Sequence, residues 1–176
     1  MKQEFVVLVD DNDNETGTME KMEAHRKALL HRAVSVFIFN SRGEWLLQQR
    51  AFDKYHSGGL WTNACCSHPY PGETTMAAAN RRLTEEMGME APLERLFRFQ
   101  YHATFESGIT EHEVDHVFIG VTDREPVINR SEANDWRYVS SHHLSEEIMD
   151  TPENFTVWFK IIFEQVKGHL HNSLKQ

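Results

Sequence analysis

Apolar and polar side chains alternate along two stretches in the second half of the chain. From residue 97 to residue 105 every second side chain is aromatic or alanine, and the positions between them are polar. The stretch from Glu111 to Val121 also follows a period of two. Because successive side chains of a strand point to opposite faces, both stretches are predicted to be strands, the first half-buried. The second would begin one face with acidic residues: Glu111, Glu113 and Asp115.

The first fifty residues predict shorter strands. Residues 5–9 are an apolar run, and residues 10–17 are a polar turn without apolar side chains. Residues 32–39 are rich in β-branched and aromatic side chains, which favour strands. A turn at residues 40–43 leads from this segment into residues 44–50. The last two segments are therefore predicted to pair as a β-hairpin.

Helices are predicted in three places. Residues 74–87 lack Gly and Pro and end at Gly88, a residue type favoured just past a helix C-terminus. Residues 20–30 form a weakly patterned helix. Near the C-terminus, apolar side chains at helical spacing predict a long amphipathic helix that covers the sheet; they are Phe155, Trp158, Phe159, Ile162, Phe163, Val166 and Leu170. We expect a single domain over residues 1–176, a mixed α/β sandwich without repeats.

Size and charge narrow the possible functions. A chain of 176 residues with 40% hydrophobic and 26% charged residues is long enough for one globular core and is not disordered. Its net charge of −9 disfavours nucleic acid as a partner, because the phosphate backbone requires a basic surface. A small anionic substrate stays compatible with this charge, since distant charges are screened and local cations dominate.

The N-terminal run and the cysteines indicate location. Residues 5–9 are too few for a signal peptide or a membrane-spanning helix. The only cysteines, Cys65 and Cys66, are adjacent, and neighbouring residues rarely meet the geometry of a structural disulfide. We therefore expect a cytoplasmic protein with reduced thiols and no membrane contact, either a monomer or a weak homodimer.

The segment from Trp61 to Pro69 brings a thiol close to an imidazole. If the segment is extended, Cys66 and His68 share one face and Cys65 points to the other. A free cysteine commonly fills space in a core, which is what we expect of Cys65. Cys66 is then the candidate for a reactive thiol.

A candidate metal site combines His25, His31, His68, Glu111 and Glu113. A shared ion requires the helix at residues 20–30 to break between the first two histidines, because their spacing would place them on different helix faces. The two glutamates lie on one strand face, roughly 7 Å apart, where both can turn toward one ion. Nitrogen and oxygen ligands together suit Zn²⁺, Mn²⁺ or Mg²⁺. The alternative is that the histidines are ordinary surface or core residues and the acidic pair is a solvated face.

Five segments together carry a specific resemblance to a known family: EKMEAH at 20–25 with His31, QRA at 49–51, TNACCSHP at 62–69, RRLTEEMG at 81–88 and EHEVDH at 111–116. They resemble the type I isopentenyl-diphosphate isomerases of the Nudix superfamily over nearly the whole chain. The resemblance implies a Nudix-type α/β/α sandwich with a mixed sheet. It also implies an isomerase that interconverts isopentenyl and dimethylallyl diphosphate through a tertiary carbocation.

The Nudix box is present in an altered form. The positions that match it are Glu73, Arg81, Glu85, Glu86 and Gly88. Ser67 replaces the glycine that opens the box, and Arg82 stands where Nudix hydrolases keep a glutamate. We interpret these two changes as the loss of the hydrolytic metal cluster.

The resemblance also implies roles for single residues. Cys66 and Glu113 would be the acid and the base, in an order that the sequence leaves open. Tyr101 would hydrogen-bond near the acidic catalyst, and the indole of Trp158 would stabilise the cation. Glu86 would hold a Mg²⁺ carried by the diphosphate, in addition to the divalent ion of the His/Glu site. The cations that match the family's diphosphate-binding positions are Lys21, Arg50, Lys54 and Arg82.

Two other classes of function stay open. A Nudix diphosphate hydrolase would use the same fold and Mg²⁺, but it would keep the glutamate that Arg82 replaces. A non-catalytic, metal-stabilised binding module would use Cys66 and His68 as structural zinc ligands. Without the resemblance, packing alone would explain Tyr101 and Trp158, and the cations would be solvated surface charges.

Overall fold

Strands contribute more residues to the described part of the fold than helices do. The computed structural model describes residues 4–173, and side chains through residue 170. The elements follow in the order β1 (Phe5–Val9), β2 (Glu15–Glu20), α1 (Lys21–Arg26), β3 (His31–Phe39), β4 (Trp45–Arg50), β5 (Trp61–Thr62), β6 (Cys65–Ser67), α2 (Thr75–Met87), β7 (Leu93–Thr104), β8 (Thr110–Val121), β9 (Ala133–Val139), α3 (Ser141–Asp150), the 3₁₀ helix η1 (Pro152–Asn154) and α4 (Val157–Ser173). The strands of this described part belong to one sheet.

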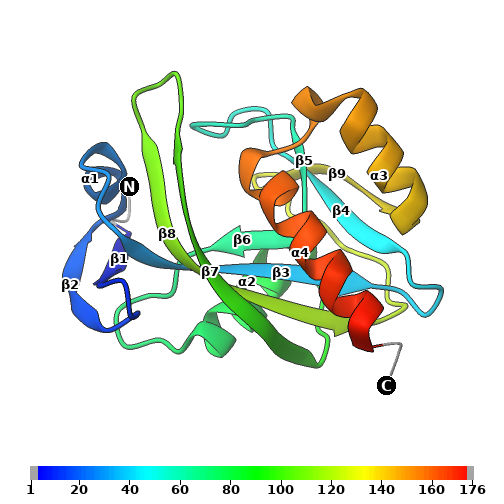
Figure 1. Cartoon of the computed structure of the whole chain (residues 1–176), viewed down its shortest axis with the longest axis horizontal. Helices are drawn as coiled ribbons and strands as arrows, with labels where there is room; N and C mark the ends of the chain where they lie inside the picture. Colours follow the sequence, from blue (N-terminus) through cyan, green and yellow to red (C-terminus); the bar gives the residue numbers. More distant parts are fainter. Residues whose placement is uncertain (1–3, 174–176) are drawn as a thin grey trace.

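The sheet is arranged around β3. This strand runs parallel to β8 along its whole length, and antiparallel to β6, where Ser35 pairs with Cys66. β8 forms a long antiparallel hairpin with β7, and this hairpin crosses the middle of the molecule in Figure 1. β4 pairs with β5 and β9. Parallel and antiparallel pairs occur together, so the predicted mixed sheet is confirmed.

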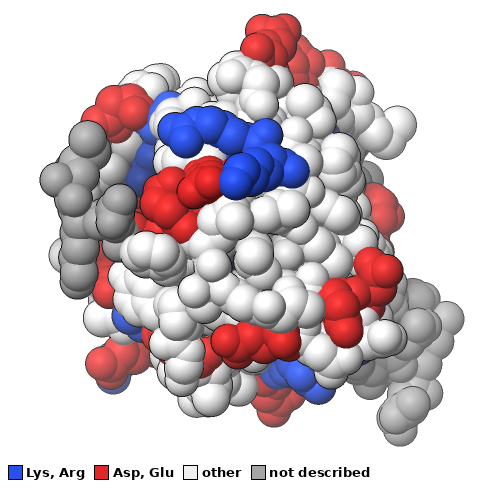
Figure 2. All heavy atoms as spheres, turned by 90° about the vertical axis from the view of Figure 1, so that its left-hand side faces the viewer, with Lys and Arg blue, Asp and Glu red and all other residues white. Residues whose placement is uncertain are grey.

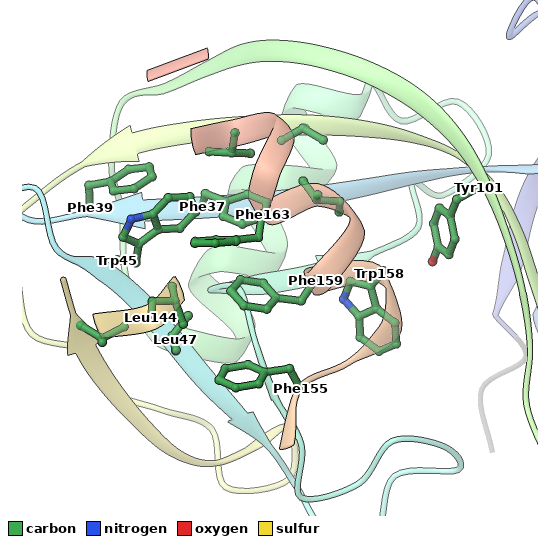
Figure 3. Close-up of a cluster of buried hydrophobic side chains, with 14 residues drawn as sticks. Phe37, Phe39, Trp45, Leu47, Tyr101, Leu144, Phe155, Trp158, Phe159 and Phe163 are labelled. Carbon is green, nitrogen blue, oxygen red and sulfur yellow. The ribbon is translucent and has the colours of Figure 1, made fainter. Parts of the chain in front are cut away.

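Alternate side chains of β3 enter two separate cores. Val34, Val36 and Ile38 pack in one core with apolar side chains of α2. Phe37 and Phe39 pack on the opposite face with side chains of α3 and α4. Figure 3 shows this second core, in which rings from the start of α4 and the segment before it meet the rings of the strands. Helices therefore cover both faces of the sheet, which is the predicted α/β/α sandwich.

The helix predicted over residues 74–87 is present with both of its ends defined by the sequence. The hydroxyl of Thr74 accepts a hydrogen bond from the backbone N–H of Ala77 at 3.1 Å, which is the usual role of an N-cap threonine. Gly88 ends the helix at φ 61°, in the left-handed region. A Cβ there would lie 2.5 Å from the carbonyl oxygen of Val127, so only glycine fits this position.

Other predicted boundaries were wrong. The helix expected over residues 20–30 ends at Arg26. The second part of the expected polar turn forms β2, because its pairing with β1 uses backbone atoms and needs no apolar side chains. The expected hairpin of β3 and β4 is paired only at Phe39 and Trp45, since β3 pairs instead with β6 and β8. Phe155 precedes α4, and the sequence pattern did not predict β9 or α3.

Within residues 4–173, no helix combines the length and the apolar character that crossing a membrane requires.

Candidate active site

Strand register brings His31, Glu113 and Tyr101 side by side. β3 pairs His31 with Glu113, and β7 pairs Tyr101 with the same glutamate. Side chains that are register partners on one face of a sheet lie within contact distance of each other. The period of two in β8 thus places an acidic face against an imidazole and a phenol.

A short break in the chain lets His25 and His31 meet. After α1 ends at Arg26, Ala28 adopts a left-handed φ of 52°, and β3 begins at His31. The two imidazole rings then lie with centroids 4.9 Å apart. His68 approaches both rings, with centroid distances of 5.5 Å to His25 and 5.0 Å to His31. The break that joint coordination requires is therefore present.

These three imidazoles and Glu113 form a compact group, here called the His/Glu group. One ligand atom from each residue lies within 4.8 Å of the others. The Nε2 atoms of His68 and His31 lie 2.9 Å and 3.4 Å from Oε1 of Glu113. Glu111, expected as a fifth ligand, lies outside this group, and so does Cys66.

The His/Glu group fits a divalent metal ion. Nδ1 of His31 lies 2.8 Å from the carbonyl of Leu29, so the neutral ring donates there and keeps a lone pair on Nε2. Both ring nitrogens of His25 are buried without a hydrogen-bond partner in the described part of the chain. A buried polar atom without a partner costs free energy, and a metal ion would supply one. Imidazole nitrogens with a carboxylate are a common ligand set for such ions.

Burial sets the protonation of this group. It lowers the pKa of His25 to about 3 and that of His68 to about 4, so both rings are neutral at neutral pH. Burial would also lower the pKa of His31, but the Glu113 carboxyl beside it raises it. The carboxyl of Glu113 is buried too, which would raise its pKa, yet the contacts with His31 and His68 hold its pKa well below the usual range. Glu113 is therefore a carboxylate.

Tyr101 links the two glutamates of β8. Its Oη atom lies 2.8 Å from Oε2 of Glu111 and 2.9 Å from Oε2 of Glu113. On the other side of Glu111, Nε2 of His56 lies 3.1 Å from Oε1, and the His56 ring stacks on Phe105 with centroids 4.5 Å apart. Glu111 is thus held between the phenol of Tyr101 and the imidazole of His56. The sequence did not predict a role for His56.

The thiol of Cys66 lies in a hydrogen-bonded pocket beside the His/Glu group. Its Sγ atom donates to Oδ1 of Asn63 at 3.2 Å and lies 3.4 Å from Oγ of Ser35. Ser35 donates to Oδ2 of Asp115 at 2.6 Å. Burial raises the pKa of the Cys66 thiol, and the nearby Asp115 carboxyl raises it further. The thiol therefore keeps its proton, while Glu113 lacks one.

A cavity of about 290 Å³ connects the thiol, the carboxylate and a set of cations. Its wall includes Cys66, Glu113, Tyr101 and Trp158. Basic side chains also line it: Lys21, Arg50, Lys54, Arg81 and Arg82. On the face seen in Figure 2, Lys and Arg side chains lie directly beside a group of Asp and Glu side chains. The wall of one cavity thus contains a candidate proton donor, a candidate proton acceptor, and both basic and acidic side chains.

Most cations of the cavity already contact a carboxylate. Arg82 donates to Oε1 of Glu86 at 2.6 Å, and Nε2 of Gln48 donates to Oε2 of the same glutamate at 2.9 Å. Lys21 pairs with Glu4 at 3.0 Å. The guanidinium of Arg50 instead lies 5.2 Å from the ring centroid of Trp158, where a cation–π contact forms.

The structure brings the sequence-predicted side chains together at one place. All of them line the cavity except His25 and His31, whose rings are buried beside His68. Pattern reasoning missed Ser35, His56, Asn63 and Glu132. A polar residue in the apolar run of β3 was a usable signal for Ser35. His56 and Glu132 lie in loops without a pattern, so no local signal marked them.

Comparisons of sequence identify the family. The NUDIX domain matches residues 29–159. The isopentenyl-diphosphate Delta-isomerase of Pectobacterium atrosepticum is 54% identical over 164 residues, which cover 93% of this chain and 92% of that protein. The isopentenyl-diphosphate Delta-isomerase 2 of Photorhabdus laumondii is 50% identical over 159 residues, which cover 90% of each chain.

Comparisons of structure agree on the fold. DR0079 from Deinococcus radiodurans superposes with a TM-score of 0.71 at 22% identity, over 84% of this chain and 90% of that one. A MutT protein from Methanosarcina mazei gives a TM-score of 0.64 at 20% identity, over 77% and 91% of the two chains. Sequence and fold together place this chain in the isopentenyl-diphosphate Delta-isomerase family of the NUDIX superfamily.

Proposed function

We propose that the protein interconverts isopentenyl diphosphate and dimethylallyl diphosphate. The observation that carries this proposal is that the thiol of Cys66 and the carboxyl group of Glu113 lie in the wall of one cavity. Burial raises the pKa of the thiol, whereas the neighbouring histidines lower the pKa of Glu113. Moving the double bond requires a proton to be added at one carbon and another to be removed elsewhere. A donor and an acceptor facing one small fragment meet that requirement.

The cavity suits a cationic intermediate. Protonation of the alkene gives a tertiary carbocation, which needs electron density but no nucleophile that would trap it. The indole of Trp158 supplies such density, and an aromatic face contributes about 0.5–2 kcal/mol to a cation. Trp158 is almost fully buried, so its ring is also kept away from water. Tyr101 orients the Glu113 carboxylate through its hydroxyl.

The basic side chains suit the diphosphate. Arg50 and Arg82 offer guanidinium groups that match phosphate oxygens in pairs, and Lys21 and Lys54 offer point charges. Glu86 lies one helical turn after Arg82 and bonds to it, so both reach the same region of the cavity. We assign to Glu86 a Mg²⁺ that enters with the diphosphate.

The resident divalent ion would be held by His25, His31, His68 and Glu113, with Glu111 as a nearby carboxylate. Zn²⁺, Mn²⁺ and Mg²⁺ all suit these ligands. When bound, the ion supplies positive charge that sets the proton affinity of Glu113. The chain itself supplies the thiol proton of Cys66 and the hydrogen bonds that hold both groups.

The proposal extends to the partner, the cellular location and the oligomeric state of the protein. The partner is a small allylic or homoallylic diphosphate, not nucleic acid or a membrane. We propose a cytoplasmic protein that acts as a single domain over residues 1–176, as a monomer or a weak homodimer.

One assay separates the candidate functions. Purified protein is incubated with isopentenyl diphosphate and Mg²⁺, and both dimethylallyl diphosphate and released phosphate are measured. An isomerase forms the allylic product without phosphate release, and the Cys66→Ala variant forms it about 10²–10⁴-fold more slowly. Release of phosphate would favour a hydrolase instead. An unchanged substrate would favour a metal-stabilised binding module, which would also unfold on chelation.

A further inference from the structure

Glu132 places a carboxylate between two cations of the cavity. One oxygen of this side chain, Oε2, bonds to Nζ of Lys54 and lies 3.2 Å from a terminal nitrogen of Arg82. Glu132 itself lines the cavity. Lys54 follows β4, whereas Arg82 belongs to α2. A single carboxylate oxygen thus occupies a position between two cations that the proposed function assigns to the diphosphate.

The backbone holds Glu132 at this place. The amide of Ala51 donates to the carbonyl of Glu132 at 3.0 Å, which ties it to the segment that carries Lys54. The amide of Asn129 donates to the carbonyl of Glu86 at 2.9 Å, and the amide of Glu132 donates to Asn129 at 2.9 Å. The turn is therefore anchored to both elements that supply the cations. These bonds fix the backbone of Glu132 beside the cavity.

Its side chain stays charged there. Burial would raise the pKa of the Glu132 carboxyl, but Lys54 and Arg82 lower it below its usual value. Lys21 and Arg82 have further carboxylate partners in Glu4 and Glu86. The positive charge that a diphosphate would meet is thus largely neutralised by the chain's own carboxylates.

We propose that Glu132 makes diphosphate binding depend on an accompanying divalent cation. This inference rests on the proposed function for the class of ligand. A metal-free diphosphate that reaches Lys54 and Arg82 must bring its oxygens beside the Glu132 oxygen that contacts both cations. The negative charges of the diphosphate and of the Glu132 carboxylate repel each other when they lie side by side. A divalent cation carried by the diphosphate removes this repulsion, so the carboxylate discriminates against the free anion.

A purely structural role for Glu132 predicts the opposite result. If its carboxylate only positioned Lys54 and Arg82, its removal would weaken diphosphate binding with and without a divalent cation. Discrimination against the free anion instead predicts tighter binding of the metal-free ligand after removal. The sign of the change therefore separates the two roles.

The test is calorimetric binding of inorganic diphosphate to the full chain, once with EDTA and once with Mg²⁺. For Glu132→Gln we expect the metal-free dissociation constant to fall about tenfold, with a much smaller change in Mg²⁺. Glu147→Gln is the matched control, because Glu147 bonds to Arg137 and neither lines the cavity. Chelation empties the His/Glu group equally in every variant, so the ratio of the two constants is compared.

A second variant keeps the test decisive. Glu132→Asp keeps the charge, so its diphosphate binding should keep the dependence on Mg²⁺. This variant can also be measured if Glu132→Gln does not fold. Weaker binding of Glu132→Gln in both conditions, or an unchanged ratio, would overturn the inference. If the unmodified protein bound no diphosphate with Mg²⁺ either, the proposed function would fall together with it.

Discussion

The Nε2 atom of His68 lies 2.9 Å from the Oε1 atom of Glu113. The other oxygen of this carboxylate accepts the hydrogen bond of Tyr101. One side chain therefore belongs both to the His/Glu group and to the wall of the cavity that faces Cys66. We therefore predict that a change of Glu113 affects both metal binding and proton transfer, whereas a change of Cys66 affects proton transfer alone.

Glu113→Gln should impair both properties. The amide keeps the size of the side chain but lacks the charge that a metal ion and a proton acceptor require. We expect turnover to fall by about 10²–10⁴-fold, the range typical of a lost acid or base, together with weaker metal binding. Steady-state kinetics and metal analysis after dialysis measure the two effects. Full metal content with lost turnover would show that Glu113 is not a ligand.

Cys66→Ala should separate the same properties. The thiol lies outside the His/Glu group, so metal content and fold should be retained. Turnover should fall by about 10²–10⁴-fold, because the protonated group on that side of the cavity is gone. Cys65→Ala is the control, since Cys65 is buried in the core against α2. Loss of metal from Cys66→Ala would contradict its assignment.

Trp158 contributes to packing and, in our proposal, to catalysis. It is 3% exposed within the core between α4 and the sheet, so Trp158→Ala should cost about 3–5 kcal/mol of unfolding free energy. Trp158→Phe retains an aromatic ring and should lose much less stability. A weaker cation–π donor should lower kcat with little change in KM. Equal kcat for Trp158→Phe and the unmodified protein would assign Trp158 to packing alone.

The metal-free protein should lose stability as the solution becomes acidic. The unfolded chain binds protons on its histidines below about pH 6.5. Folded His25 and His68 resist protonation until about pH 3 and 4, because burial lowers the pKa of both. Protons therefore favour the unfolded state as the pH falls from 6.5 toward 4. The raised pKa of His31 acts in the opposite sense. The stability that it contributes is present below pH 6.5 and is lost as the pH rises through the pKa of the folded state.

Thermal unfolding with a chelator between pH 7 and pH 5 measures this effect. His25→Gln should flatten the fall in Tm, whereas His142→Gln should leave it unchanged because His142 is 87% exposed. A Tm that rises on acidification would mean that His31 outweighs the other two histidines.

Local patterns predicted much of the fold. The helix at 75–87 was predictable because Gly88 ends it and its interior lacks breakers, and β7 and β8 were predictable from alternation. The parallel pairing of β3 with β8 was not, because it joins segments about eighty residues apart and leaves no local signal. β2 was missed because its strand is polar and held by backbone hydrogen bonds.

The candidate site likewise contains residues that the sequence predicted and residues that only the tertiary structure reveals. His25, His31, His68 and Glu113 could be grouped from residue type and strand periodicity, and the structure brings them together. Glu111 lies outside this group, and its carboxylate contacts Tyr101 and His56. Whether His56 or Glu132 enters the cavity depends on how loops close over the sheet. Such contacts follow from the tertiary structure and not from spacing along the chain.

The most direct test of the central claim is proton NMR of isopentenyl diphosphate with the protein and Mg²⁺ in deuterated water, with released phosphate assayed in the same sample. We predict methyl signals of dimethylallyl diphosphate, deuterium in the new methyl group, and no released phosphate, because one group adds a solvent-derived proton and another removes one. Phosphate release without any shift of the double bond would contradict the account.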